Sequence, residues 1–335
     1  VMEEVVSAWN AEAMGSIVLA AVSAVVTMRW FLGNAPLFRV PGFELTHPGE
    51  LAIYAVIGVF GGLFSALFIR LIERLRARLD RLPQRTELVQ ALAAGFFVGA
   101  VGLWLPQVMG AGYDAIDFAL HDRFSWNLLL LLGGAKLLVT LLCFSAGVPG
   151  GMFAPALFIG AMIGGGLGGM AHHYWPVITS PASAYVLVGM GTFFAGVFRA
   201  PMTSIFMVFE VSASYVIILP VMVANTISYF ISRRLHPVPF FTMLSRLEGI
   251  DLPSAEEYRS IELRRVEDAM RPAPEGPSLS YAPRIYPDVP LDAAMRLLAE
   301  HDILRVCSRA DKSRVIGVVS LEDVHRAYGI PENFG

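Results

Sequence analysis

GVPGGMFAP (residues 147–155) decides the fold, because it interrupts two long apolar segments, residues 128–144 and 156–170. The glycines and prolines of this stretch are poor formers of a continuous helix. In a lipid bilayer, irregular backbone is tolerated only where it is buried in protein or lines a wet cavity. Pro155 suits the first turn of a following helix, where an N–H group has no partner within the helix in any case. The sequence therefore predicts a membrane helix that is broken at this loop.

The backbone N–H groups at this break are the first candidate for a binding function. A helix that starts near Pro155 leaves Gly151, Met152 and Phe153 with free N–H groups at its N-terminus. That end carries about half a positive charge from the helix macrodipole. The loop has no cationic side chain, so the free N–H groups and the helix dipole are its positive features. This pattern favours a site for a small anion. A glycine–proline kink in a continuous transmembrane helix is the alternative, and the motif alone leaves both interpretations open.

The composition is typical of a polytopic membrane protein. The chain has 335 residues, of which 55% are hydrophobic and 16% charged, and its mean hydropathy is +0.59. A net charge of -3 gives no reason to expect nucleic acid as a partner. The cysteines Cys143 and Cys307 lie in different regions, so we expect neither a disulfide framework nor a metal site, and we interpret both as buried small apolar residues.

Several stretches resemble the CLC family, which contains chloride channels and proton-coupled chloride exchangers. They are LLCFSA (141–146), PALFIGAMIGGGLG (155–168), VFRAPMT (197–203) and FEV (209–211). The resemblance extends from residue 1 to about residue 253, and Gly151 begins a match to the family's G-x-F-x-P anion-binding loop. It implies that chloride rests on the N–H groups of Met152 and Phe153, while Ala154 and Pro155 shape the turn.

The resemblance also implies the architecture. We expect an all-α polytopic membrane protein with tilted and broken helices, forming the second half of an inverted repeat, followed by a small α/β tail. The membrane region is residues 1–250, a charged linker is residues 251–264, and the tail is residues 265–335. The expected apolar helices cover residues 13–32, 51–72, 88–105, 128–144, 156–170, 184–197, 200–215 and 216–231. Several of them are too short to span about 30 Å of hydrocarbon alone.

The distribution of arginines predicts the orientation in the membrane. Arginines gather at one end of the second apolar helix, and Arg233 and Arg234 end the last one. Positively charged helix ends face the cytoplasm in most membrane proteins. We therefore expect a multi-pass integral membrane protein, in a bacterial inner or plasma membrane, with a cytoplasmic C-terminal tail.

The tail, residues 265–335, resembles a single CBS domain. Its pattern reads as helix, loop, amphipathic helix, strand and helix, with the ending GVVSLED at residues 317–323. In CBS domains the serine or threonine and the aspartate of this ending contact adenosine nucleotides, which makes Ser320 and Asp323 nucleotide-binding candidates. The alternative is that both residues only cap the helix that follows, a role that suits both residue types.

Two side chains bear on the anion site in different ways. The last membrane helix of CLC proteins begins with a tyrosine whose hydroxyl donates to the central anion, and the position that matches it is Phe241, which lacks that donor. Lys136 lies within an apolar stretch, where an ionisable side chain is a functional candidate. Lys136 either attracts anions or satisfies carbonyl or carboxylate groups between helices, and we favour the structural role.

Glu4 bears on the choice between exchanger and channel. It matches the inner glutamate that relays protons in CLC exchangers, where channels carry an apolar residue or threonine. A buried glutamate holds its proton more tightly, so it can load and release protons near neutral pH. We therefore expect a proton/chloride exchanger that is regulated through the tail. A passive chloride channel is the alternative.

A further alternative is a truncated regulatory fragment that does not transport. Residues 1–9 and 207–215 form a weak internal repeat, and the chain starts at Val1 without methionine. The family's G-S-G-I-P and G-x-E-G-P loops do not occur in the sequence. We therefore expect most of the first repeat to be missing. CLC proteins form homodimers in which each subunit holds its own pathway, so a homodimer is expected here.

Other classes of function fit the sequence poorly. An intramembrane metalloprotease needs H-E-x-x-H on a helix, and this pattern does not occur. A divalent-cation transporter needs acidic residues in its membrane helices, and residues 128–231 contain only Glu210. His172 and His173 are adjacent, so they point about 100° apart on a helix and cannot share one metal. We expect no enzymatic activity and no cofactor, with chloride and protons as the substrates.

Overall fold

The computed structural model describes residues 11–33, 38, 40, 47, 49–83, 86–212, 215–247, 264–273, 282–311 and 314–328. The chain divides into two compact units, Val1–Leu252 and Pro253–Gly335, which we describe separately. Glu4 and almost the whole of the expected linker lie outside the described residues.

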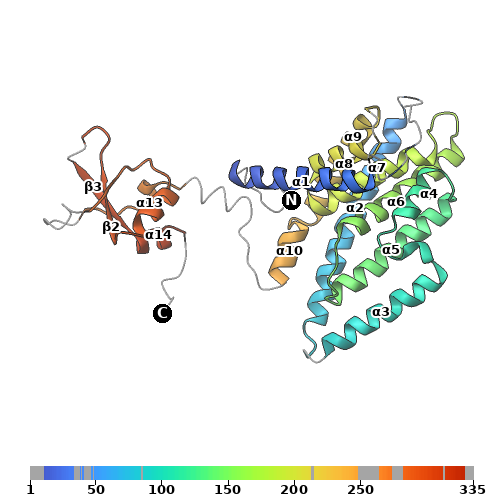
Figure 1. Cartoon of the computed structure of the whole chain (residues 1–335), viewed down its shortest axis with the longest axis horizontal. Coiled ribbons are helices and arrows are strands. Elements are labelled where there is room, and N and C mark those ends of the chain that lie inside the picture. The colour runs from blue at the N-terminus through green and yellow to red at the C-terminus, as the bar shows by residue number, and fades with distance from the viewer. Residues whose placement is uncertain are drawn as a thin grey trace. The chain divides into compact units, whose positions relative to one another are not determined.

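The first unit is helical throughout its described residues (Figure 1). Its elements are α1 (Ala11–Leu32), α2 (Glu50–Leu79), α3 (Glu87–Trp104), η3 (Pro106–Val108), α4 (Tyr113–Leu120), α5 (Trp126–Ser145), α6 (Phe153–Tyr174), α7 (Ala182–Phe198), α8 (Pro201–Ser212), α9 (Ile218–Leu235) and α10 (Phe240–Leu247). Among the described helices, α2, α3, α5 and α6 are long and apolar enough to cross a membrane, and α7 and α8 are shorter apolar helices. This mixture of long and short apolar helices matches the prediction from sequence.

Helix α7 forms the centre of this unit. Its side chains from Ala184 to Phe198 are all buried. It packs on α6, α9, α2 and α8, so that helices surround it on several sides. A helix that is apolar around its whole circumference is expected in such a position.

Glycines bring α6 and α7 into backbone contact. A Cβ atom added to Gly164 of α6 would lie 2.5 Å from the carbonyl oxygen of Tyr185, and one added to Gly189 of α7 would lie 2.5 Å from the Cα of Gly164. Only residues without a side chain allow such an approach, as in other tightly packed membrane helices. The contact fixes the position of α6 against the central helix.

Hydroxyl groups from neighbouring helices bind the carbonyl groups of α7. Each of the bonds is 2.7 to 3.2 Å long, and each donor is a fully buried serine. The donors and acceptors are Ser65 to Phe193, Ser204 to Gly191, Ser228 to Thr192, and Ser232 to Gly196. Interhelical hydrogen bonds of this kind join helices where the hydrophobic effect cannot, because lipid is as apolar as the side chains.

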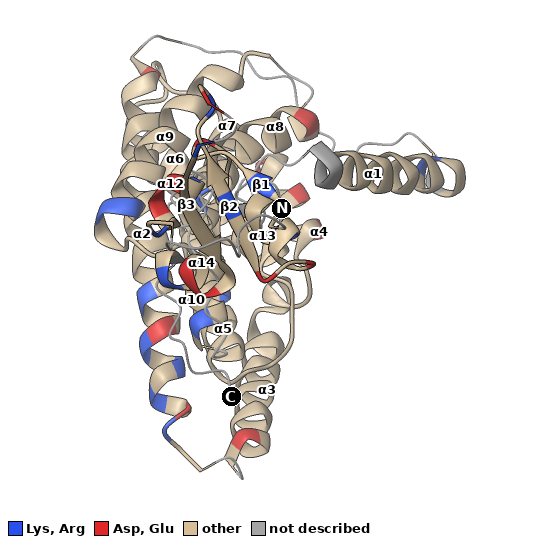
Figure 2. Cartoon of the chain, turned by 90° about the vertical axis from the view of Figure 1, so that its left-hand side faces the viewer, with Lys and Arg blue, Asp and Glu red and all other residues tan. Residues whose placement is uncertain are grey.

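The basic cluster lies at the C-terminal end of α2, as the sequence indicated. Figure 2 shows the blue segments gathered at this end of the helix, where Arg74, Arg76 and Arg78 lie. Glu50 at the other end is completely buried and accepts hydrogen bonds from the hydroxyls of Tyr54 (3.1 Å) and Tyr185 (2.7 Å) and from the N–H of Ser180 (2.9 Å). The carboxylate thus ties the start of α2 to α7.

The second unit contains a small three-stranded sheet with helices. Its elements are α12 (Val266–Ala269), β1 (Arg284–Ile285), α13 (Leu291–Leu298), β2 (Ile303–Cys307), β3 (Val315–Ser320) and α14 (Leu321–Tyr328). The strand order is β1-β2-β3, with β1 parallel and β3 antiparallel to β2. The sequence predicted the three helices and β3, but not the two preceding strands.

One prediction about buried residues needs correction. Cys307 is buried, but Cys143 near the end of α5 is only partly buried. Both cysteines are free thiols.

The glycine contact gives a test of the α6–α7 packing. Gly164→Ala should lower the free energy of unfolding by about 1–3 kcal/mol, the usual cost of overpacking, because the new methyl group meets the α7 backbone. Thermal unfolding in detergent measures this. The matched control is Gly134→Ala in α5, where no atom lies within 4 Å of the added methyl group. Equal stability of the two variants would contradict the proposed contact.

Candidate anion site

The break in the membrane helix lies where the sequence predicted it. Helix α5 ends at Ser145, and Gly147 follows in the left-handed conformation at φ 70°. The N–H of Gly147 donates to Phe144 O (3.2 Å) and the N–H of Val148 to Cys143 O (3.1 Å). These two bonds are the Schellman pattern that ends a helix, and they favour glycine at the left-handed position.

Helix α6 then begins at Phe153, with Met152 as its N-cap residue and Pro155 in its first turn. The N–H of Ala156 donates to Met152 O at 3.0 Å, which is the first bond of the helix. Within the described part of the chain, no acceptor lies in hydrogen-bonding range of the N–H groups of Gly151, Met152 and Phe153. A continuous kinked helix is therefore wrong, and these N–H groups are available at the positive end of α6.

A cavity of about 370 Å³ lies in front of these N–H groups. Of the predicted site residues, it brings Gly151, Met152, Phe153 and Phe241 together, although Phe241 is distant in sequence. The remaining residues of its lining are Phe144, Gly150, Phe194, Phe198, Ala200, Thr203, Phe240 and Leu244. Ala154 and Pro155 do not line it and belong to the helix turn behind the loop.

Half of the residues that line the cavity are phenylalanines. Phe241 stacks on Phe198 with a centroid distance of 5.5 Å, and Phe198 meets Phe240 edge to face at 6.0 Å. Phe153 meets Phe194 edge to face at 5.2 Å. The edge of an aromatic ring is weakly positive, so such a wall tolerates an anion better than an aliphatic wall does.

This aromatic wall was not predicted from the sequence. Phe194 and Phe198 are four residues apart on α7, so they share one face of the helix. That spacing was readable from the sequence, but it is also typical of ordinary core packing. The partner rings from α5 and α10 come together only through the tertiary fold.

Lys136 takes the structural role that the sequence favoured. Its ammonium group is buried and donates to the carbonyl oxygens of Val108 (2.7 Å) and Gly110 (2.6 Å). It also lies over the ring of Phe158 at 5.2 Å from the centroid. Gly110 and Gly112 both have positive φ, so the glycine-rich turn is structural and Lys136 holds it against α5.

The remaining predicted site residues lie elsewhere. Glu4 lies outside the described residues. Ser320 and Asp323 belong to the second unit, where the N–H and hydroxyl of Ser320 both donate to Asp323 Oδ2, at 2.9 and 2.8 Å. Asp323 also pairs with Arg271 at 2.6 Å. The two residues therefore cap α14, and a nucleotide would have to compete with these contacts.

Metal binding finds no support in the described part of the chain, where no group of three or more potential metal ligands occurs. Of the two adjacent histidines, His172 contacts the hydroxyl of Thr179 through Nδ1 at 2.9 Å, and His173 lies against the ring of Tyr174.

These features define a class of protein: a polytopic membrane protein with a broken helix whose N-terminus faces a cavity. The sequence pattern of the voltage-gated chloride channel family matches residues 1–233. The chain belongs to this family.

Named relatives agree with this assignment. The H(+)/Cl(-) exchange transporter ClcA of Vibrio cholerae is 28% identical over 248 residues, covering 71% of this chain and 53% of its own length. The chloride channel protein CLC-e of Arabidopsis thaliana is 33% identical over 234 residues, covering 64% of this chain and 33% of its own length. The chain therefore spans about half the length, or less, of these curated relatives.

Solved structures share the fold. A slow cyanobacterial Cl-/H+ antiporter superposes with a TM-score of 0.63 at 25% identity, covering 68% of this chain and 53% of the antiporter. A eukaryotic CLC transporter superposes with a TM-score of 0.61 over 100% of this chain and 57% of its own, at 19% identity. At that identity, the second match speaks for the fold alone.

Replacement of Lys136 separates its structural role from an electrostatic one. Lys136→Met should lower the free energy of unfolding by about 1–3 kcal/mol, because the carbonyl oxygens of Val108, which is buried, and of Gly110 lose their donor. Unfolding in detergent measures the loss, and Arg81→Met in the exposed turn after α2 is the control. Unchanged stability together with weaker chloride binding would assign Lys136 to anion attraction instead.

Proposed function

We propose that this chain forms the anion-binding part of a membrane transporter that moves chloride, and that it works as a proton/chloride exchanger. The observation that carries the proposal is the cavity of about 370 Å³ in front of the first N–H groups of α6. Membership of the voltage-gated chloride channel family supports chloride as the anion. The chain spans about half the length of the relatives it matches, so transport is proposed for the whole protein.

In this proposal, chloride accepts hydrogen bonds from the N–H groups of Met152 and Phe153. Gly151 leaves room for the ion beside the backbone, and Ala154 and Pro155 hold the first turn of α6. The ring of Phe241 lies across the cavity and offers an edge rather than a hydroxyl. Helix dipoles and N–H groups bind anions at helix N-termini in many proteins, so no cationic side chain is required.

Proton coupling is assigned to Glu4, on the strength of the sequence match alone. The name of the Vibrio cholerae relative, an H(+)/Cl(-) exchange transporter, supports exchange in this chain. The name of the Arabidopsis relative, a chloride channel protein, keeps passive conduction as the alternative.

The second unit is proposed to be a cytoplasmic, CBS-like regulatory domain that binds an adenosine nucleotide near Ser320 and Asp323. Its sheet and flanking helices support this, but the capping contacts of both residues favour a structural role. We also propose a homodimer in a bacterial inner or plasma membrane. Apolar side chains exposed on α8 and α9, such as Phe206 and Leu219, support contact with lipid or a second subunit.

A gain of chloride affinity tests the anion site. Phe241→Tyr should tighten chloride binding about fivefold, because the new hydroxyl adds one hydrogen bond of ordinary strength. Calorimetric titration with chloride measures the affinity, and anomalous scattering from bromide locates the ion. Phe206→Tyr, on an exposed ring of α8, is the matched control. Bromide density away from Met152 and Phe153 would overturn the site.

A change at Glu4 tests the coupling to protons. Glu4→Ala in the whole protein, reconstituted in liposomes, should abolish proton movement driven by a chloride gradient while chloride movement continues. A pH-sensitive dye inside the liposomes reports the protons. Glu3→Ala is the control, since it removes a neighbouring carboxylate. Proton movement that persists in Glu4→Ala would exclude this residue as the relay.

A further inference from the structure

The position of the Phe240–Phe241 wall depends on a short turn between α9 and α10. Helix α9 ends at Leu235, α10 begins at Phe240, and residues 236–239 join them. Phe240, Phe241 and Leu244 of α10 all line the anion cavity. Any contact that fixes this turn therefore also fixes one wall of the cavity.

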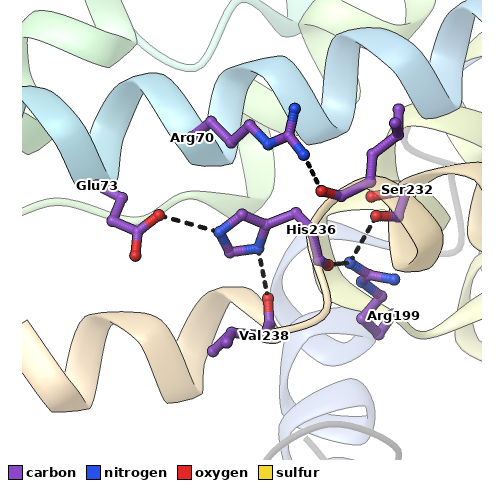
Figure 3. Close-up of polar contacts among 7 residues, drawn as sticks. Arg70, Glu73, Arg199, Ser232, His236 and Val238 are labelled. Carbon is purple, nitrogen blue, oxygen red and sulfur yellow. Dashed lines mark hydrogen bonds and ion pairs between the residues drawn. The ribbon is translucent and has the colours of Figure 1, made fainter.

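Two arginines from other helices bind the end of α9 (Figure 3). Arg70 of α2 donates to the carbonyl oxygen of Leu235, and Arg199 donates to those of Ser232 and His236. The last carbonyl groups of a helix have no partner within the helix, and the guanidinium group supplies several donors in a fixed geometry. Arg199 itself lies at the end of α7 with a φ of 57°, a conformation that non-glycine residues seldom adopt.

Each ring nitrogen of His236 lies within hydrogen-bonding distance of an oxygen atom. Its Nδ1 lies 2.9 Å from the carbonyl oxygen of Val238, and its Nε2 lies 3.1 Å from Glu73 Oε2 of α2. The imidazole side chain is 7% exposed. Figure 3 shows the ring lying between these two oxygens.

Both partners of the His236 ring are hydrogen-bond acceptors. A carbonyl oxygen accepts a hydrogen bond, and so does a carboxylate oxygen, so each ring nitrogen faces an acceptor. A protonated imidazole ring donates to both, whereas a neutral ring donates to only one. Pro237 and Pro239 have no N–H group, so the backbone of the turn has few donors of its own. The ring therefore supplies bonds that the backbone of this turn does not.

We propose that His236 is a positioning residue for the anion cavity: through Glu73 and the Val238 carbonyl, it sets where α10 places Phe240 and Phe241. The inference rests on the proposed anion site only for its functional consequence. The geometry itself stands on contacts among α2, α7, α9 and α10, which all belong to the first unit. The charged groups facing this turn are Glu73 and Arg70 from α2 and Arg199 from the end of α7.

A thiol at position 241 reports the position of the wall. The parent chain for this test carries Cys143→Ser, Cys307→Ser and Phe241→Cys, and its rate of reaction with a maleimide is the reference. Adding His236→Ala should raise the rate about fivefold, the factor that corresponds to one lost hydrogen bond. His173→Ala, which removes an exposed imidazole from the end of α6, is the matched control. An unchanged rate in His236→Ala would overturn the proposal.

Conservative variants keep the test decisive if His236→Ala fails to fold. His236→Gln retains a donor for Glu73 and should keep the rate near that of the parent chain. Glu73→Leu removes the oxygen that accepts from Nε2 of His236 and should raise the rate. Rates that do not separate these two variants would contradict a positioning role.

Chloride titration connects the position to the proposed function. His236→Ala should weaken chloride binding about fivefold without changing the number of sites, because the N–H groups of α6 remain. If the parent chain binds no chloride, the proposed anion site fails. The thiol experiments still decide whether His236 positions α10, so the two failures are distinguishable.

Discussion

Backbone contact between α6 and α7 is the constraint on which the rest of the first unit depends. Gly164 and Gly189 let the two helices approach until main-chain atoms touch. Because α7 is buried along its length, neighbours on several sides fix its position. The backbone contact with α7 then fixes the position of α6. The N-terminus of α6 thus faces its cavity because of contacts made several turns away. The serine hydroxyls on the α7 carbonyl groups stiffen the same centre from α2, α8 and α9.

At the break between α5 and α6, the backbone groups of the two helix ends differ in their hydrogen bonding. The bonds donated by the N–H groups of Gly147 and Val148 satisfy the carbonyl groups of Phe144 and Cys143 at the end of α5. The start of α6 is treated differently, since its first N–H groups have no acceptor in the described residues and face a cavity. Carbonyl groups at the end of α5 are hydrogen-bonded, whereas the N–H groups at the start of α6, a few residues later, have no acceptor in the described residues. That asymmetry distinguishes a true break between two helices from a kink within one.

Much of this arrangement was predictable from local chemistry. The glycines and prolines of residues 147–155 mark the break, and the apolar stretches mark the helices to within a few residues. The structural role of Lys136 was also foreseen, because a buried ammonium group needs acceptors. Its acceptors, Val108 and Gly110, were not foreseen, since they come from a turn more than twenty residues earlier. The aromatic wall and the clamp on His236 likewise join helices that are distant in sequence, and no local pattern encodes such pairs. In the second unit, β1 and β2 are short strands whose residues alternate too weakly to be recognised.

The engagement of Lys136 with two carbonyl oxygens means that this cation does not serve the proposed anion site. Lys136 holds the turn at Val108 and Gly110, and none of the described residues that line the cavity is a lysine or arginine. At the proposed site an anion would therefore meet amide dipoles and ring edges but no full opposite charge. Permeation requires binding that is not too strong, because an ion that binds too firmly blocks those behind it. A lining of this kind suits an ion that has to leave again as well as bind.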